Sequence, residues 1–285
     1  MKLKLQLIFI FLGFISLNAE DLRLQMEQLS KDLSSYKIID VRDVNDYQNG
    51  HIANALNFPI SLSYDDKSIT GKLTEPNKIQ EILRKLGLDV NDQVVIYDDG
   101  TFFDSARLFW GLEVYGFKNV KLLNGGFNEW NKLNFSTSKE TPNIKESKYI
   151  ASVDNKKLAT KFSTQIATKS PSIIIMDARK YNAYIGEESI AKRFGHIPQA
   201  ISRPATHNIA TINDFPKLKD LKELEEIYKD IDKNKKIISY CDIGKISSSN
   251  YFALRQLGYE VANYDASWKE WGNDLELPIT NISKK

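Results

Sequence analysis

Residues 236–247 read KIISYCDIGKIS, and this stretch decides the fold class because it joins a strand, a tight loop and a helix start. The β-branched run at 236–240 predicts a buried strand. Gly244 permits the backbone conformation that a tight loop needs, and the serines that follow are typical helix N-caps. A strand that leads through a short loop into a helix is the repeating unit of parallel α/β sheets. Cys241, the only cysteine of the chain, lies where this strand ends.

Strands and helices alternate along the rest of the chain. Further β-branched runs predict strands at 37–41, 94–97, 120–123, 173–176 and 261–264. Helical spacing of apolar residues predicts helices at 77–86, 105–115, 221–231 and 248–257. This alternation indicates mainly parallel sheets with helices on both faces, and a length of 285 residues is typical of two domains.

The second half of the chain repeats the first in the same order. Five blocks match: 40–42 with 177–179, 50–55 with 195–200, 95–98 with 238–241, 115–117 with 257–259, and 124–130 with 265–271. The sequence therefore predicts one domain at 20–137, an exposed linker at 138–150 and a second domain at 151–285. The alignment of the two halves places Asp98 opposite Cys241.

These repeated blocks carry a resemblance to a known family. The blocks resemble those of the tandem rhodanese family of thiosulfate and 3-mercaptopyruvate sulfurtransferases. The features that carry the resemblance are Asp-Val-Arg, Gly-His-Ile, the strand that ends in Cys or Asp, and the Gly-Gly-Phe and Ser-Trp blocks. The resemblance covers essentially the whole chain after residue 19. It implies two rhodanese-like domains, of which the first is non-catalytic, with Asp98 at the cysteine position, and the second is catalytic.

The loop after Cys241 is suited to holding a negatively charged sulfur. Successive backbone N–H groups of a tight loop form a concave anion site, and a helix N-terminus behind it adds partial positive charge. The expected site is therefore catalytic Cys241 with a persulfide-binding loop of Asp242, Ile243, Gly244, Lys245, Ile246 and Ser247. The plainer alternative is an inert cysteine that fills space at a strand end.

The expected reaction is ping-pong sulfur transfer through a Cys241 persulfide. The donor is thiosulfate, 3-mercaptopyruvate or polysulfide, and the acceptor is cyanide or a thiol, with a protein acceptor left open. The alternative hypothesis is a sulfur carrier that delivers persulfide sulfur to a partner protein without turnover of small molecules. A phosphatase is disfavoured because Ser247 stands where phosphate binding needs an arginine.

The loop departs from the family pattern, which leaves the donor open. Asp242 and Ile243 replace residues that are Gly and Ser in mercaptopyruvate enzymes, or Arg and Lys in thiosulfate enzymes. Asp242 repels a dianionic donor if its side chain faces the pocket, and Lys245 is either a donor-binding cation or a surface lysine. Arg193 and Arg107 are the candidates for further substrate binding.

Several classes of function lack support in the composition. Three histidines and one cysteine offer no metal-ligand spacing, so we expect no metal and no cofactor. His51 and His196 occur in both repeats, although only one repeat has the thiol, which favours structural roles. No basic stripe with interleaved aromatic residues occurs, and nucleic-acid binding is not expected.

The N-terminus has the pattern of a secretory signal peptide. Residues 1–4 include two lysines, 5–17 are almost uniformly apolar, and Ala19 supplies the small residue at the cleavage site. The alternative is a short N-terminal anchor, although the apolar run is short for a membrane span, which needs roughly 20 residues. We therefore expect cleavage after residue 19, a periplasmic or secreted protein, and no stable membrane insertion afterwards.

Overall fold

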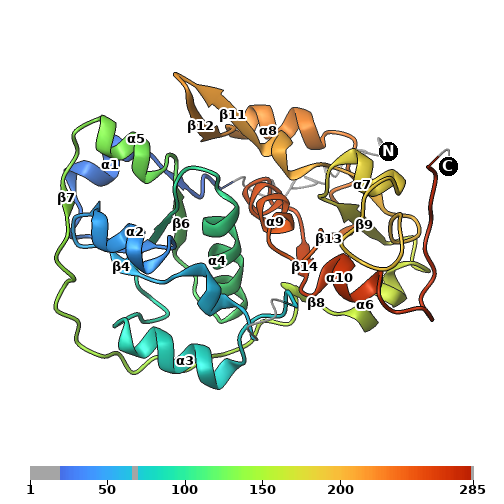
Figure 1. Cartoon of the computed structure of the whole chain (residues 1–285), viewed down its shortest axis with the longest axis horizontal. Helices are drawn as coiled ribbons and strands as arrows, with labels where there is room; N and C mark the ends of the chain where they lie inside the picture. Colours follow the sequence, from blue (N-terminus) through green and yellow to red (C-terminus); the bar gives the residue numbers. More distant parts are fainter. Residues whose placement is uncertain (1–19, 66–69, 284–285) are drawn as a thin grey trace, which may run out of the picture.

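The computed structural model describes residues 20–65 and 70–283. The predicted signal peptide at 1–19 lies outside the described residues. The described chain forms two α/β domains side by side, with helices α4 (Phe103–Val114) and α9 (Ser247–Gln256) packed between them (Figure 1). The prediction of two tandem domains with mainly parallel sheets is confirmed. None of the helices in the described ranges has the length and hydrophobicity needed to span a bilayer.

Each domain is built on a five-stranded parallel sheet. The first sheet has the order β1 (Arg23–Leu24), β6 (Val120–Leu123), β5 (Val94–Tyr97), β2 (Lys37–Asp40) and β4 (Leu56–Asn57). The second has the same order, with β8 (Leu158–Ala159), β14 (Val261–Tyr264), β13 (Lys236–Tyr240), β9 (Ile173–Asp177) and β10 (Ile201–Ser202). The duplicated sequence thus gives duplicated topology, with β5 and β13 at the centre.

Helices cover both faces of each sheet. The first domain has α1 (Met26–Lys31), α2 (Val44–Asn49), α3 (Pro76–Lys85), α4 and α5 (Phe127–Lys132). The second has α6 (Lys161–Ala167), α7 (Tyr181–Ile185), α8 (Leu221–Tyr228), α9 and α10 (Ser267–Trp271). Short 3-10 helices η1 (Ile60–Ser63) and η2 (Ala205–Asn208) occupy equivalent places, as do α4 and α9.

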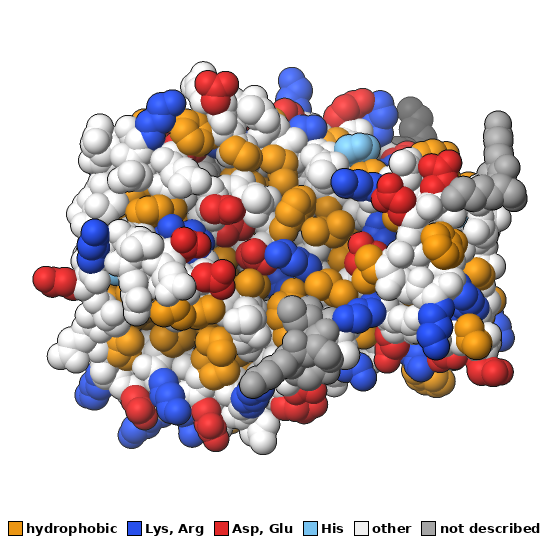
Figure 2. Space-filling view, in the orientation of Figure 1, with side chains coloured by type: hydrophobic (Ala, Val, Ile, Leu, Met, Phe, Trp, Pro, Cys, Tyr) orange, Lys and Arg blue, Asp and Glu red, His pale blue; other side chains and the backbone are white. Residues whose placement is uncertain are grey.

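One hydrophobic core joins the two domains. Helices α4 and α9 are buried on almost every side, and the rings of Phe109 and Phe252 meet edge to face at 4.9 Å. Glu113 adds a buried polar link, because it accepts hydrogen bonds from Tyr251 and Arg255 of the second domain. Hydrophobic side chains also gather along the seam in Figure 2, with acidic and basic side chains among them. This packing holds the two domains in fixed contact.

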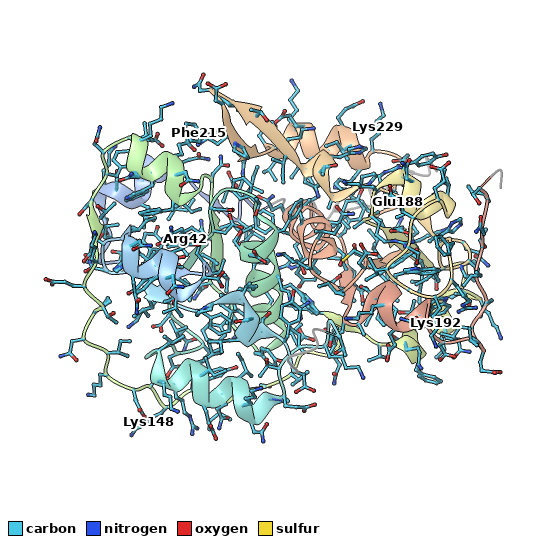
Figure 3. All side chains as sticks on the ribbon, viewed as in Figure 1. Arg42, Lys148, Glu188, Lys192, Phe215 and Lys229 are labelled. Carbon is cyan, nitrogen blue, oxygen red and sulfur yellow. The ribbon has the colours of Figure 1, made fainter. Side chains whose placement is uncertain are left out.

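Near the carboxyl edges of the two sheets, each domain contributes a segment that contacts the other domain. From the second domain, the hairpin of β11 (Ile209–Ile212) and β12 (Phe215–Leu218) extends toward α5, and Phe215 lies beside it (Figure 3). The Leu218 N–H donates to Asn124 Oδ1 at 2.9 Å. From the first domain, the Leu73 N–H donates to the Asp265 carboxylate, also at 2.9 Å. Asn124 and Asp265 follow equivalent strands, so the two contacts are related by the duplication.

Two further strands complete the fold. The β3 strand (His51–Ile52) pairs antiparallel with β7 (Thr137–Ser138), which ties the end of the first domain back to its Gly-His-Ile block. The rings of His51 and His196 each stack on a tyrosine, at 3.8 and 3.9 Å between centroids. Each Nδ1 also bonds to a backbone carbonyl. Both histidines therefore hold loops in place, as the sequence indicated.

Candidate active site

Cys241 lies directly after the central strand β13 and is only 1% exposed. Its backbone N–H donates to Ser267 Oγ at 3.1 Å, and the Ser247 hydroxyl donates to its Sγ at 3.3 Å. Apolar side chains pack around the sulfur, namely Ala178, Ala205 and the partly buried Phe103 and Ile246. The thiol is therefore fixed in position, with one hydroxyl donor aimed at the sulfur.

The backbone carbonyls of the loop are all held by hydrogen-bond donors. Backbone N–H groups donate to four of them at 2.9–3.1 Å: Trp268 to residue 241, Lys269 to 242, Ser248 to 245 and Ser249 to 246. Side chains donate to the other three at 2.9–3.5 Å: Arg107 to residue 243, Asn263 and Ser248 to 244, and Ser239 to 247. Gly244 makes this path possible for two reasons. Its φ of +71° lies in the left-handed region that favours glycine, and a Cβ there would lie 2.3 Å from the Asp265 carbonyl oxygen. The loop carbonyls are thereby committed to partners other than the sulfur.

The N–H groups of the loop are in the opposite situation. Among the described residues, the backbone N–H groups of 242–247 have no hydrogen-bond acceptor. They precede α9, whose N-terminus adds partial positive charge at the same place. A run of free N–H groups in a tight loop is an anion-binding cradle. The predicted loop residues 242–247 are therefore brought together beside Cys241.

The equivalent loop of the first domain shows such a cradle filled. The buried Asp98 carboxylate accepts from the N–H groups of Gly100, Phe102 and Ser105 at 2.8–3.2 Å, and from the Ser105 hydroxyl at 3.0 Å. Its backbone carbonyl accepts from Phe127 N as that of Cys241 accepts from Trp268 N. Burial raises the pKa of Asp98 even though these N–H groups lower it. In the first domain the loop N–H groups therefore converge on the anion of Asp98, the residue equivalent to Cys241.

A buried ion pair supports each loop from the neighbouring strand. Arg179 binds Asp177 at 2.6 Å and the Gly195 carbonyl, and Tyr240 donates to the same Asp177 carboxylate. Arg42 and Asp40 repeat the arrangement in the first domain. Each Asp–Arg pair is therefore formed within its own domain.

The two charged loop residues turn toward different partners. The Lys245 ammonium lies 2.6 Å from the Asp104 carboxylate of the first domain. The Asp242 carboxylate, 36% exposed, lies 4.0 Å from Arg179 Nη1. Burial raises the pKa of Asp242, and Arg179 opposes that rise. The charge of Lys245 is therefore compensated from across the domain interface.

Arg107 is part of the site, although it is not open to a substrate. Its side chain is fully buried under the loop, and its guanidinium donates to Ser63 Oγ at 3.0 Å and the Gly71 carbonyl at 2.9 Å. A longer contact of 3.5 Å reaches the Ile243 carbonyl. The guanidinium also stacks on the Tyr64 ring at 4.0 Å. Arg107 thus connects the first domain to the Cys241 loop.

The structure does not bring Arg193 to the loop. Its guanidinium donates to the backbone carbonyls of Trp271, Gly272, Asp274 and Leu277. Within the described part of the chain, these bonds anchor the segment after α10, and none reaches the Cys241 loop. The neighbouring Lys192 projects beside that segment as well (Figure 3). The Arg193 side chain thus has a local structural role, and the Lys192 backbone N–H donates to Asn273 Oδ1 in the same segment.

Sequence reasoning missed several residues that shape the site. Ser267 binds the Cys241 N–H, Asn263 holds the Gly244 carbonyl, and Asp265 holds the first domain against the loop through Leu73. Burial raises the pKa of Asp265 to about 6, against the opposing effect of Arg107. The matched blocks 124–130 and 265–271 already pointed to this region, but not to its contact with the loop.

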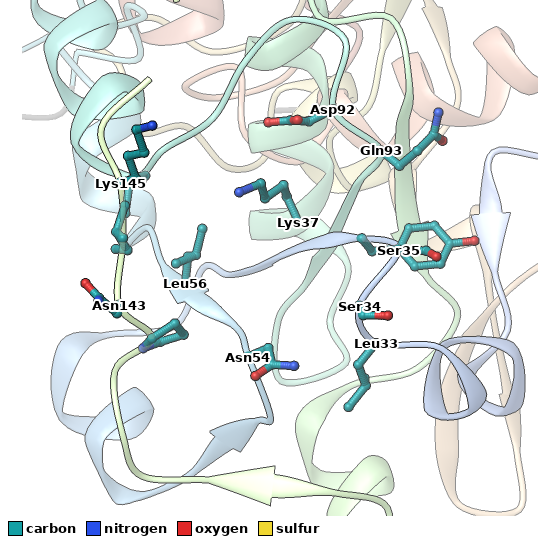
Figure 4. A pocket seen from close by; sticks show the side chains of 14 residues that line it. Leu33, Ser34, Ser35, Lys37, Asn54, Leu56, Asp92, Gln93, Asn143 and Lys145 are labelled. Carbon is teal, nitrogen blue, oxygen red and sulfur yellow. The ribbon is translucent and has the colours of Figure 1, made fainter. Parts of the chain in front are cut away.

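Open cavities lie elsewhere in the molecule. One of about 570 Å³ is found at the amino ends of β2 and β5, where residues 142–145 form its far wall (Figure 4). Its charged side chains are Lys37, Asp92 and Lys145. It lies at the opposite edge of the sheet from the loops and contains no nucleophilic thiol. Within the described ranges, no three His, Cys, Asp or Glu side chains gather as a metal site.

The sequence pattern of the rhodanese-like domain matches twice, at residues 21–133 and 158–274. The chain belongs to the rhodanese family. The match covers both duplicated domains and places the Asp98 loop in the first copy and the Cys241 loop in the second. The family resemblance inferred from the repeated blocks is therefore confirmed.

Individual relatives match between 82% and 93% of this chain. It is 29% identical to a putative thiosulfate sulfurtransferase of Haloferax volcanii, covering 93% of this chain and 96% of that protein. It is 31% identical to the putative thiosulfate sulfurtransferase SseA of Mycobacterium leprae, covering 82% and 81%. It is 28% identical to the 3-mercaptopyruvate sulfurtransferase of Escherichia coli K12, covering 83% and 85%.

Solved structures agree with this assignment. The Escherichia coli 3-mercaptopyruvate sulfurtransferase SseA superposes with a TM-score of 0.77 at 25% identity, covering 87% of this chain and 98% of that one. A variant of EanB bound to ergothioneine gives a TM-score of 0.82 at 20% identity, covering 94% and 72%, which shows the shared fold alone. The prediction that the chain is a sulfurtransferase enzyme is confirmed.

Proposed function

We propose that this sulfurtransferase carries sulfane sulfur on Cys241 as a persulfide. Sulfur from thiosulfate, 3-mercaptopyruvate or polysulfide is passed to a thiol or cyanide acceptor. The observation that supports this most directly is the row of N–H groups at 242–247, next to Cys241, which have no acceptor within the described part of the chain. Because the equivalent N–H groups already hold the Asp98 carboxylate, such a loop is built to hold an anion.

The proposed reaction has two steps. The Cys241 thiolate attacks the outer sulfur of the donor, a Cys–S bond forms, and the donor's sulfur–carbon or sulfur–sulfur bond breaks with its electron pair on the leaving group. The acceptor nucleophile then attacks the outer sulfur of the persulfide, and the thiolate of Cys241 leaves. The loop N–H groups stabilise the negative terminal sulfur between the steps. The Ser247 hydroxyl stabilises the Cys241 thiolate.

A donor panel with intact-mass detection tests the persulfide. Loading of one sulfur atom adds about 32 Da to Cys241. Cys241→Ser should abolish loading and turnover while leaving the free energy of unfolding nearly unchanged. If no donor adds this mass to the natural chain, or if the serine variant keeps turnover, the persulfide mechanism is wrong. Turnover with cyanide separates the enzyme from the less favoured carrier, which would load sulfur but release it only to a partner protein.

Residues 1–19 are proposed to direct export to the periplasm or beyond. The basic start, the apolar run and Ala19 support this proposal, and the segment lies outside the described residues. Cell fractionation and N-terminal sequencing of the mature chain test it. A cytoplasmic protein that retains Met1 would overturn it.

A further inference from the structure

Lys245, the only cationic side chain of the catalytic loop, already forms an ion pair. Lys245 forms its 2.6 Å ion pair with Asp104, and the two side chains are 34% and 26% exposed. Since Asp104 belongs to α4 of the first domain, domain packing fixes this carboxylate beside the loop. A second anion that arrives with a substrate has to compete with a carboxylate that is already in place.

Acidic side chains dominate the other side of the loop. Asp242 directly follows the nucleophile and stays partly exposed. Its nearest cation, Arg179, is engaged by Asp177, which lies closer to it. Glu188, in the exposed segment after α7, adds its negative field to Asp242 (Figure 3). Negative charge is therefore concentrated on this side of the loop, at the residue that directly follows Cys241.

The wall around the sulfur is apolar. Cys241 packs with Ala178 and Ala205, and the partly buried Phe103 and Ile246 extend this surface toward solvent. Such a surface favours alkyl groups over a strongly hydrated anion such as a sulfonate, because burying a charge without a partner is costly.

We propose that Asp242, together with the Lys245–Asp104 pair, makes the site selective for singly charged sulfane donors with an apolar end. Organic persulfides and thiosulfonates belong to this class, and dianionic thiosulfate is disfavoured. This inference rests on the proposed persulfide on Cys241. For a thiosulfonate, the Cys241 thiolate attacks the outer sulfur, the S–S bond breaks, and a sulfinate leaves with the electron pair. A persulfide donor releases a thiolate in the same way.

Thiosulfate and methanethiosulfonate form a matched pair of donors, because a methyl group in one replaces a charged oxygen in the other. We expect kcat/KM of the natural chain to favour methanethiosulfonate by more than tenfold. Removal of one negative charge at Asp242 by Asp242→Asn should reduce that preference about fivefold, the scale of a screened charge pair near a protein surface. Higher ionic strength should raise the thiosulfate rate more than the thiosulfonate rate.

Two further variants make the test specific. Asp104→Asn removes the ion-pair partner of Lys245, so kcat/KM for thiosulfate should rise relative to kcat/KM for methanethiosulfonate. Asp99→Asn is the matched control, since exposed Asp99 follows Asp98 as Asp242 follows Cys241. It should leave the donor preference unchanged.

The outcomes distinguish this inference from the proposed function. If neither donor nor polysulfide adds sulfur to Cys241, the persulfide mechanism itself fails. If both load Cys241 but thiosulfate is used equally well, the inference on charge is wrong. A donor preference that Asp242→Asn and Asp104→Asn leave unchanged also overturns it. A preference lowered by both variants, but not by the Asp99 control, supports it.

Discussion

Asp98 and Cys241 occupy the same point of two equivalent loops, each directly after the central strand of its sheet. In the first domain the Asp98 carboxylate accepts from the loop N–H groups, and in the second the N–H groups of 242–247 have no acceptor among the residues that the structure describes. A carboxylate that bonds to its own loop stabilises a structure, whereas a free ring can hold charge that develops during a reaction. The duplication thus gives one loop a structural carboxylate, and the other is the loop for which we propose a chemical role.

Asp98→Ala should destabilise the chain and leave the chemistry intact. The substitution removes the acceptor from three buried N–H groups and one hydroxyl, each costly to leave unpaired. We expect a loss of about 2–3 kcal/mol in the free energy of unfolding, measured by urea denaturation. Sulfur loading of Cys241 in the folded fraction should remain. Asp99→Asn, at an exposed position, serves as the control, and an Asp98→Ala chain of natural stability would contradict the structural role.

Ser247→Ala should weaken the chemistry and leave the fold intact. The Ser247 hydroxyl donates to Cys241 Sγ at 3.3 Å, and a hydrogen bond to a charged group contributes about 1.5–3 kcal/mol. We therefore expect the rate of persulfide formation to fall about tenfold in single-turnover experiments. Ser248→Ala is a useful comparison, because that hydroxyl holds the Gly244 carbonyl instead of the sulfur. An unchanged loading rate in Ser247→Ala would show that the hydroxyl plays no part.

Much of the architecture could be predicted from local pattern. The helices expected at 105–115 and 248–257 correspond to α4 and α9, and the β-branched runs became the central strands. The hairpin at 209–218 was missed. Its signal was Asn213-Asp214, which form a two-residue turn with positive φ at both residues. The alternating strands around that turn are only partly buried, and their apolar pattern is correspondingly weak.

The partners of the charged site residues could not be predicted from sequence. Lys245 pairs with Asp104, and Arg107 lies beneath the loop, only because α4 and α9 pack together. Both pairings join residues that are distant in sequence and belong to different domains. Local spacing indicates which side chains carry chemistry, but contacts across a domain interface depend on the packing of whole helices.

Arg107→Lys should slow catalysis by disturbing the loop. Lysine keeps the charge but cannot reach the Ser63, Gly71 and Ile243 oxygens with one planar group. We expect kcat to fall about tenfold or more while KM changes less, because Arg107 positions the loop without touching the donor. Arg255→Lys is the control, since Arg255 pairs with Glu113 in the same interface. It should cost stability without this change in kcat, and natural kcat in Arg107→Lys would refute the positioning role.

Asp265→Asn should stabilise the chain at neutral pH. Burial raises the pKa of Asp265 from 3.8 to about 6, although Arg107 and Lys72 oppose the rise and Glu270 adds to it. Because the folded state binds the proton more tightly than the unfolded state, the ionised carboxylate weakens folding above pH 6 and this cost disappears toward pH 4. The asparagine should still accept the Leu73 N–H, as Asn124 accepts that of Leu218.

The expected gain from Asp265→Asn is about 1–3 kcal/mol at pH 7, on the scale of one to two pKa units. Urea denaturation of the natural chain and the variant at pH 7, 6 and 5 measures it. The difference should shrink as the pH falls through 6, because the natural carboxyl group then becomes protonated and loses its charge. A variant that is less stable at pH 7 would show that the ionised Asp265 stabilises the domain contact through its charge. A difference that does not change with pH would show that ionisation of Asp265 is not its cause.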